Sequence, residues 1–204
     1  AIYKVNDISR YGSVQFSEGR LKRIAEKEGS GEGYVNAGIY VLPPEIVDIA
    51  EEVSESPRGE YELTDAIMEL NKKKPIRTIP IEGYWNDIGY PWDYLDANMY
   101  YLDKVKCIIS DTAEIWPQAI IRKPVIIGDD ATVKNSMIER SVIGNDCTIG
   151  EFSAVKRSVI MNHSNAPHFN YVADSVIGEN VNLGAGTKIA NLRFDEKPIK
   201  VTIC

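Results

Sequence analysis

Branched aliphatic residues recur at six-residue steps through the second half of the chain, from about Val125 onward. Several are followed by glycine, as in Ile127-Gly128 and Ile149-Gly150. They form three runs separated by two out-of-phase breaks: Ile127 and Val133; Ile143, Ile149, Val155 and Met161; and Ile177, Leu183 and Ile189. Such a repeat is typical of a parallel β-helix, in which each side of a triangular coil buries one aliphatic side chain. The sequence therefore predicts an all-β, left-handed parallel β-helix over residues 125–204, with these side chains stacked inward.

The first hundred residues have a different pattern, in which predicted strands and helices alternate. Residues 12–27 indicate two short strands around a turn at residues 17–19, and residues 34–42 indicate a buried strand. Apolar residues at helical spacing follow from residue 44, from residue 64 and from residue 91. This pattern predicts an α/β domain over residues 1–105, joined to the β-helix by a linker at residues 106–124.

Composition and charge restrict the partners of the chain. Its 204 residues carry a net charge of −7, with an isoelectric point near 5.0, whereas a nucleic-acid polymer is bound by clustered Lys and Arg. Small phosphorylated ligands need only a few local cations. The three cysteines, Cys107, Cys147 and Cys204, are scattered and suggest neither a disulfide framework nor a zinc site, which fits a cytoplasmic protein.

Five short motifs follow one another between residues 11 and 102: YG, EK, VNAGIY, RGEYELTDAI and GYWNDIG. Their order resembles the second half of the sugar-1-phosphate nucleotidylyltransferase domain, a Rossmann-like domain that makes NDP-sugars from an NTP, here UTP or dTTP, and a sugar 1-phosphate. The resemblance implies that Asp87 holds the catalytic Mg²⁺ and that the sugar is bound by Glu26, Lys27 and Asn36. Mg²⁺ and a lysine suit this reaction because attack on the α-phosphorus builds negative charge.

The chain departs from this family pattern in two ways. The G-x-G-x-R-x-x-P loop that holds the triphosphate and the first magnesium-binding Asp are not found in these residues, and Glu28 replaces a proline of the family. The chain also starts without Met and stops at Cys204 without a visible capping coil. We therefore expect a central fragment of a longer protein, unable to transfer a nucleotide by itself.

Residues 167–201, PHFNYVADSVIGENVNLGAGTKIANLRFDEKPIKV, contain the most specific motif of the second half. They resemble the acetyl-transfer site of the bifunctional uridylyltransferase and acetyltransferase family, especially its archaeal members. The resemblance implies that His168 is the general base when a sugar amine attacks acetyl-CoA, a role that histidine suits near neutral pH. It implies that the Ala185 backbone N–H stabilises the oxyanion and that Asn191 orients the amine or acetyl group. The implied sugar-phosphate ligands are Lys156, Tyr171, Asn182 and Lys197.

Three alternatives remain open at this point. Asn182 and Asn191 could instead form an asparagine ladder along the coils. Phosphate binding is also in question, because Ile138 stands where the family places a phosphate-binding arginine, with Arg140 two residues later. The protein could be a monofunctional pyrophosphorylase whose β-helix only assembles or regulates it, which the H-x-x-Y and GAG elements disfavour. It could also be a non-catalytic scaffold, which the missing Gly-rich loop favours. The resemblance further implies a homotrimer with acyl-transfer sites between subunits.

Overall fold

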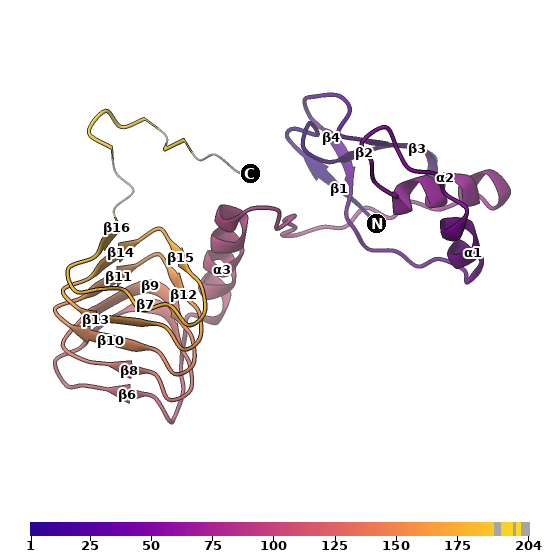
Figure 1. The fold of residues 1–204 in the computed structure, drawn as a ribbon. Coiled ribbons are helices and arrows are strands. Elements are labelled where there is room, and N and C mark those ends of the chain that lie inside the picture. Colours follow the sequence, from indigo (N-terminus) through magenta and orange to yellow (C-terminus); the bar gives the residue numbers. More distant parts are fainter. Residues whose placement is uncertain (190–192, 198, 201–204) are drawn as a thin grey trace. The chain divides into compact units, whose positions relative to one another are not determined.

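The structure, a computed structural model, describes residues 1–189, 193–197 and 199–200. The chain divides into two compact units, Ala1–Asp87 and Ile88–Cys204. The first unit contains an antiparallel sheet and two helices, and the second contains one helix and a stack of parallel coils (Figure 1).

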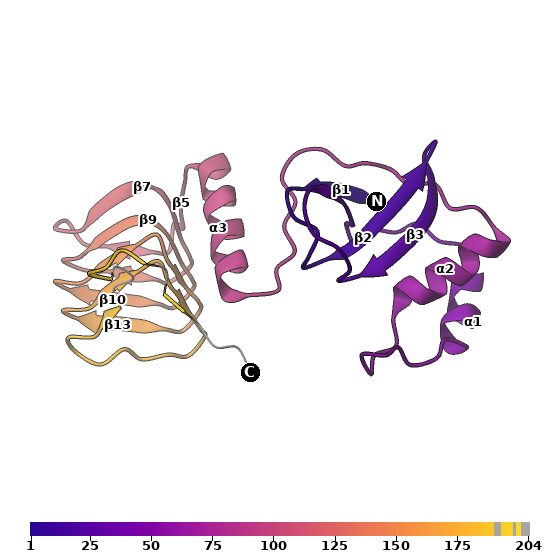
Figure 2. The same ribbon diagram turned by 90° about the horizontal axis from the view of Figure 1, so that it is seen from above.

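The sheet of the first unit has the strand order β1-β4-β2-β3, and Figure 2 shows β2 and β3 side by side. Its strands are β1 (Ile2–Val5), β2 (Gly12–Ser17), β3 (Arg20–Glu26) and β4 (Gly33–Asn36), and β2 and β3 form the predicted hairpin. Helix α1 (Glu45–Glu51) packs on helix α2 (Leu63–Lys73), which also packs on β3. After α2, the chain forms two isolated bridges with the sheet, Arg77 with Arg20 and Pro80 with Ile2.

The second unit is a parallel β-helix of about five turns, which confirms the predicted architecture. Each strand pairs in parallel with the strand of the next coil. The strands are β5 (Cys107–Ile109), β6 (Glu114–Ile115), β7 (Ile120–Ile127), β8 (Thr132–Val133), β9 (Met137–Ile143), β10 (Thr148–Glu151), β11 (Ala154–Lys156), β12 (Val159–Ile160), β13 (Asn165–His168), β14 (Tyr171–Ala173), β15 (Val176–Ile177) and β16 (Lys188–Ile189).

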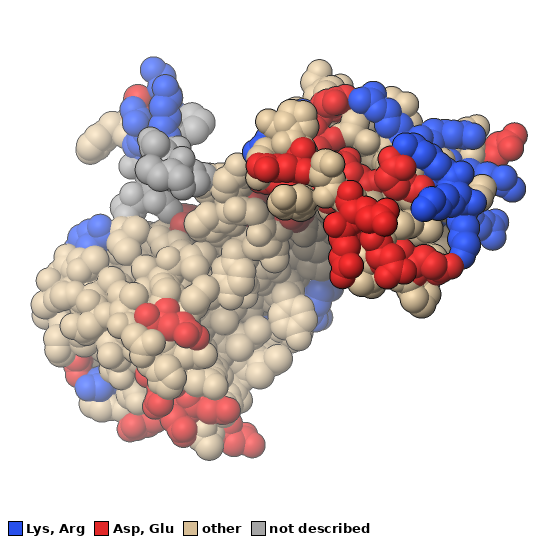
Figure 3. Space-filling view, turned by 45° about the vertical axis from the view of Figure 1, so that its right-hand side comes forward, with Lys and Arg blue, Asp and Glu red and all other residues tan. Residues whose placement is uncertain are grey.

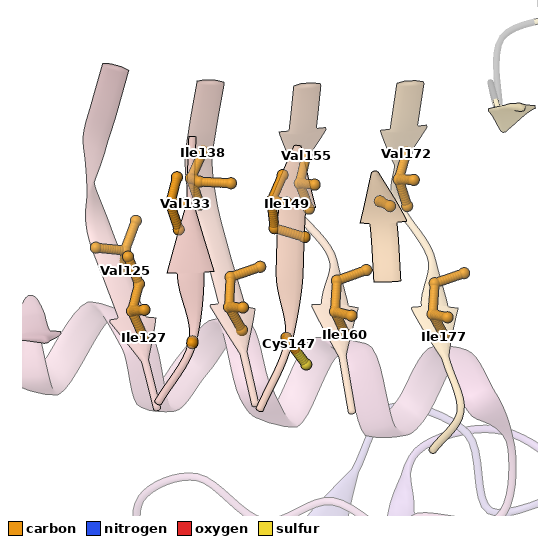
Figure 4. Close-up of a cluster of buried hydrophobic side chains, with 13 residues drawn as sticks. Val125, Ile127, Val133, Ile138, Cys147, Ile149, Val155, Ile160, Val172 and Ile177 are labelled. Atoms are coloured by element: carbon orange, nitrogen blue, oxygen red, sulfur yellow. The ribbon is translucent and has the colours of Figure 1, made fainter. Parts of the chain in front are cut away.

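Aliphatic side chains fill the interior of this β-helix in three columns (Figure 4). Residues of one column pair across successive coils, so that burial is continuous along the stack. The columns are Ile127, Ile143, Ile160 and Ile177; Val133, Ile149 and Ala166; and Ile138, Val155, Val172 and Ile189. Leu183 and Ile189 are partly buried against the same core. The predicted inward stacking is therefore confirmed, with one exception.

The exception is Met161, because the inward residue at this point is Ile160. Ile160 pairs with Ile143 and Ile177, each 17 residues away, so one side of each of these two coils is a residue shorter than the six-residue step requires. The coil from Ile127 to its partner Ile143 is 16 residues long and has two short sides. The out-of-phase breaks in the sequence are these short sides. Met161 instead packs outside the coil, against the helix that covers it.

The second unit begins earlier than the sequence pattern indicates. Helix α3 (Pro91–Val105) lies along the coils, with Leu95, Met99 and Leu102 buried against Val159. Arg140 and Arg157, at two coil corners, form ion pairs with Asp103 (2.8 Å) and Asp96 (2.7 Å) of α3.

Residues 106–124, predicted as a linker, also belong to the coils. β5 pairs with β7 and β6 pairs with β8, because Ile115 and Ile121 continue two of the inward columns. The structure thus corrects the predicted boundaries: the coils start at Cys107, and α3 is part of their unit.

Charged side chains on the visible face of the first unit gather by sign, with acidic and basic groups in separate areas (Figure 3). Within the described residues, no helix combines the length and the apolar character needed to cross a bilayer.

Candidate functional site

Glu26 and Asn36 lie at the same end of the sheet in the first unit, on either side of Gly12. Gly12 pairs with Glu26 across β2 and β3, and the register Ser13 to Val35 places Gly12 next to Asn36 on the other side. A Cβ atom at Gly12 would lie 2.7 Å from Oε1 of Glu26. The missing side chain at Gly12 therefore leaves room for the Glu26 carboxylate at this end of the sheet.

Tyr40 interacts with two of the three predicted sugar ligands, Asn36 and Glu26. The Asn36 side-chain NH₂ group donates a hydrogen bond to the Tyr40 hydroxyl, and the Asn36 side-chain oxygen accepts one from the Gly38 backbone N–H (3.1 Å). Burial raises the pKa of Tyr40, and the negative charge of Glu26 adds to this rise. Lys27 is exposed, and its backbone N–H donates to the Tyr11 carbonyl (3.0 Å).

Trp85 fixes the segment that carries Asp87. Its indole N–H donates to the Ala37 carbonyl (3.1 Å), and its ring packs on Tyr3 and Tyr11, with centroids 5.2 and 5.6 Å away. These contacts hold the W-N-D sequence beside the residue that follows Asn36. Asp87 itself is exposed.

Asp87 fits a magnesium site only as one ligand among several. In the described part of the chain, no group of three or more His, Cys, Asp or Glu side chains could hold a metal ion. Mg²⁺ prefers oxygen ligands and often takes only one or two carboxylates, with water and substrate phosphates supplying the rest. An exposed carboxylate such as Asp87 suits that role.

His168 ends β13 on the outer surface of the β-helix, directly above Glu151 of the coil below. Its Nδ1 atom lies 3.3 Å from Oε2 of Glu151, and the two side chains are 56% and 33% exposed. The His168 backbone N–H donates to the side-chain oxygen of Asn170 (3.0 Å), which is buried. Asn170 also donates to the Gly184 carbonyl (2.8 Å) and therefore connects His168 to the GAG turn of the next coil.

Ala185 and Asn182 lie on the same side of the β-helix as His168. Asn182 pairs with Asn165 at the start of this side. Ala185 is exposed in the turn above His168, and the next residue, Gly186, donates its N–H to the His168 carbonyl (3.0 Å). The predicted base and the predicted oxyanion donor therefore occupy adjacent coils.

Lys156 and Tyr171 lie on the neighbouring side of the coils, with Lys156 Nζ 6.0 Å from the Tyr171 ring centroid. Lys156 also lies 3.9 Å from Glu139, which contacts Arg122 at 3.4 Å. Ile138 is fully buried in an inward column, so its position cannot present a cation to a phosphate. Arg140 points to α3, where it pairs with Asp103.

One predicted residue, Lys197, has no contact with this group among those the structure gives. Lys197 is exposed in a segment with local contacts, including a weak hydrogen bond from its own N–H to Asp195 (3.4 Å). Asn191 lies outside the described residues.

The site residues predicted from the sequence do not include Gly12, Glu151 or Asn170. Glu151 precedes His168 by 17 residues, which is the true coil length, so recognition of the short sides would have placed it beneath the histidine. Asn170 stands inside the H-x-x-Y motif and above Ser153, whose hydroxyl accepts its backbone N–H (3.1 Å). Gly12 had only the weak YG signal.

Two families match the chain. The family described as Nucleotidyl transferase matches residues 1–104, and the family described as GlmU-like, C-terminal hexapeptide, matches residues 118–202. The bifunctional protein GlmU of Methanocaldococcus jannaschii is 40% identical over 231 residues, covering 100% of this chain and 55% of that protein. The chain belongs to the Nucleotidyl transferase family, and its second part matches the GlmU-like hexapeptide family. This result confirms both resemblances seen in the motifs.

Two further relatives are similar to the chain. A bifunctional sugar-1-phosphate nucleotidylyltransferase/acetyltransferase of Sulfurisphaera tokodaii is 41% identical over 98% of this chain and 55% of its own length. A glucose-1-phosphate thymidylyltransferase of Streptomyces antibioticus is 32% identical over 66% of this chain and 38% of its own length. The chain thus spans about half the length of the bifunctional relatives that it matches.

Proposed function

We propose that the protein encoded by the complete gene has two activities. One makes an NDP-sugar and pyrophosphate from a sugar 1-phosphate and UTP or dTTP, and the other transfers an acetyl group from acetyl-CoA to an amino-sugar 1-phosphate. The observation that carries the second activity is the placement of His168 between Glu151 below and Ala185 above, within the GlmU-like segment. The cytoplasm, which contains these substrates, is the proposed location.

In the acetyl-transfer reaction, His168 acts as the general base. Its Nε2 takes a proton from the sugar amine as the nitrogen attacks the thioester carbon. The Ala185 N–H donates to the carbonyl oxygen while that oxygen carries the developing negative charge. The C–S bond then breaks, and the CoA thiolate takes the proton from the imidazolium, so that charge and protons balance.

The remaining side chains bind and orient the substrates. Lys156 and Tyr171 supply a cation and a hydroxyl donor that suit the sugar phosphate. Asn182 and Lys197 are assigned to the same phosphate-bearing substrate, and Asn191 to orientation of the amine or acetyl group. Because the buried Ile138 supplies no cation, we propose that the lysines mainly neutralise the charge of the phosphate.

For nucleotidyl transfer, the end of the sheet binds the sugar. Beside Gly12, Glu26 accepts hydrogen bonds from the sugar hydroxyl groups, and the Asn36 side-chain amide exchanges hydrogen bonds with them. Lys27 supplies a positive charge. Asp87 would hold Mg²⁺, which neutralises the charge that develops on the phosphates. Trp85 keeps Asp87 beside this sugar-binding end.

We further propose a homotrimer assembled through the β-helix. Two exposed phenylalanines support this assembly: Phe152 and Phe169 stack at the corner beside His168, with ring centroids 5.4 Å apart. Exposed apolar groups next to a reaction site are suitable for covering by a neighbouring subunit. Sedimentation equilibrium of the protein from the complete gene should give three times the subunit mass.

A His168→Ala variant tests the acetyl-transfer proposal. Loss of a general base should lower acetylation by about 10²- to 10⁴-fold, while pyrophosphate release from the nucleotidyl reaction stays nearly unchanged. Thiol release from acetyl-CoA, with glucosamine and galactosamine 1-phosphates, measures the first activity. Equal rates for wild type and variant would exclude His168 as the base. Wild-type protein with nucleotidyl transfer alone would be a pyrophosphorylase, and protein with neither activity would be a scaffold.

An Asp87→Ala variant tests the metal assignment. Removal of a carboxylate that positions charge-neutralising Mg²⁺ should lower pyrophosphate release by about 10²- to 10³-fold. Acetyl transfer in the same variant serves as the control and should not change. Full nucleotidyl transfer by Asp87→Ala protein would remove Asp87 from the metal site.

A further inference from the structure

A column of outward-facing side chains runs across four consecutive coils to His168. Trp116 lies in the first coil, with its ring centroid 5.2 Å from Lys134 Nζ in the second. Lys134 Nζ lies 3.5 Å from Oε1 of Glu151 in the third coil, and Oε2 of the same carboxylate lies 3.3 Å from His168 Nδ1 in the fourth. The two oxygens of Glu151 therefore face different partners.

The backbone determines this arrangement. Glu151 and His168 are direct partners in the parallel pair of β10 and β13, and the Phe169 N–H donates to the Glu151 carbonyl (3.0 Å). A Cβ atom at Gly150 would lie 1.8 Å from the Pro167 carbonyl oxygen, so the two coils approach closely just before this pair. The contact between Glu151 and His168 thus follows from coil register rather than from two long side chains that meet by chance.

The surroundings of Glu151 favour its carboxylate form. The pKa of Glu151 is lowered by a hydrogen bond from its own backbone N–H and by the charges of Lys134 and His168, although partial burial opposes this effect. Lys188, from the coil above, donates to the Phe169 carbonyl. At neutral pH His168 Nδ1 therefore faces a hydrogen-bond acceptor.

We propose that Glu151 is the positioning residue for His168, accepting the Nδ1–H and leaving the lone pair on Nε2. This inference rests on the acetyl-transfer function proposed above. A neutral imidazole carries one proton, and the hydrogen bond made by one nitrogen decides which nitrogen is free to act as base. The 3.3 Å separation is within the range of a hydrogen bond, and hydrogen bonds in active sites often tighten when substrate binds.

The tautomer of His168 gives a direct test that does not depend on activity. Long-range ¹H–¹⁵N spectra of the imidazole at about pH 8.5, well above the ordinary imidazole pKa, should show Nδ1 protonated in the wild type. Glu151→Gln should shift the population toward the Nε2–H form that imidazole prefers in water. Glu151→Ala repeats the test without an amide oxygen that can still accept. A tautomer unchanged in both variants would overturn the proposal.

Kinetics supply the second readout. Glu151→Gln should lower kcat for acetyl transfer by about 10- to 100-fold, with little change in KM for the amino sugar. This loss is smaller than the roughly 10⁴-fold loss for the buried aspartate of a serine-protease triad, because solvent reaches the Glu151 site. A purely structural role would instead lower the melting temperature and leave the tautomer in place.

The chain contains a matched control. His163 Nδ1 also lies 3.3 Å from a carboxylate of the coil below, that of Asp146, at a different corner. Asp146→Asn removes the same kind of contact and should leave acetyl transfer unchanged. If the wild type releases no thiol from acetyl-CoA, the proposed function fails, but the tautomer spectra still decide whether Glu151 orients His168.

Discussion

The absence of one side chain shapes the proposed sugar-binding end of the first unit. Gly12 lies between Glu26 and Asn36, and any residue with a Cβ would meet the Glu26 carboxylate. The group that would have to move is the far end of a flexible side chain rather than backbone. A substitution here should therefore disturb binding much more than folding.

We accordingly expect Gly12→Ala to raise KM for the sugar 1-phosphate by about tenfold, since overpacking typically costs 1–3 kcal/mol. The displaced Glu26 carboxylate would no longer lie where the sugar hydroxyl groups meet it. Steady-state pyrophosphate release measures this effect, and KM for the nucleotide should stay the same. An unchanged sugar KM would place the sugar elsewhere.

The motifs identify candidate site residues only where distinctive side chains stand in short, ordered patterns. His168, Tyr171, Glu26 and Asn36 belong to this class, and their placement follows the motif order. Glu151 was not predicted because only the coil register brings it next to His168. Gly12 was not predicted because it acts by having no side chain, which leaves room for the Glu26 carboxylate. A local pattern does not contain either kind of information.

At the scale of the coil, hydrogen bonding and close packing fix the 17-residue repeat. Ser141, Ser158 and Ser175 occupy one corner, and each lower hydroxyl accepts the backbone N–H of the serine above it (3.1 Å). These bonds satisfy backbone groups that the short side leaves at the corner. The six-residue pattern predicted the β-helix and most of its core, but it misplaced Met161 because it assumed equal sides.

The glycine after an inward isoleucine is required only where coils approach closely. Gly150→Ala should destabilise the β-helix by about 1–3 kcal/mol or more, because the new Cβ meets the Pro167 backbone carbonyl at 1.8 Å and backbone cannot move aside as a side chain can. Thermal unfolding followed by circular dichroism measures the loss.

Gly178 is the matched control for this substitution. It follows Ile177 in the same sequence pattern, but no atom of the described residues lies within 4 Å of its Cβ position. Gly178→Ala should therefore melt within a degree or two of the wild type. Equal losses in the two variants would show that the close approach at Gly150 is not the cause.

At the scale of the whole molecule, α3 decides where the second unit starts. Its apolar residues Leu95, Met99 and Leu102 cover Val159 and a strip of partly buried residues on the coils: Ile126, Val142, Met161 and Val176. Two ion pairs to coil arginines add to this packing but are partly exposed and contribute little. The sequence predicted α3 as a helix but could not show which unit it covers.

The corrected boundary predicts that residues 88–204 are a more stable piece than residues 106–204. Each large apolar side chain transferred from water contributes about 1.5–3 kcal/mol, so loss of three such residues removes a large part of the 5–15 kcal/mol typical of a domain. The shorter piece should melt at a much lower temperature or aggregate. In the intact chain, Leu102→Ala should cost about 2–5 kcal/mol, whereas Tyr101→Ala, at an exposed position of the same helix, should change stability little. Identical melting temperatures of residues 88–204 and 106–204 would show that α3 does not stabilise the coils and belongs with the first unit.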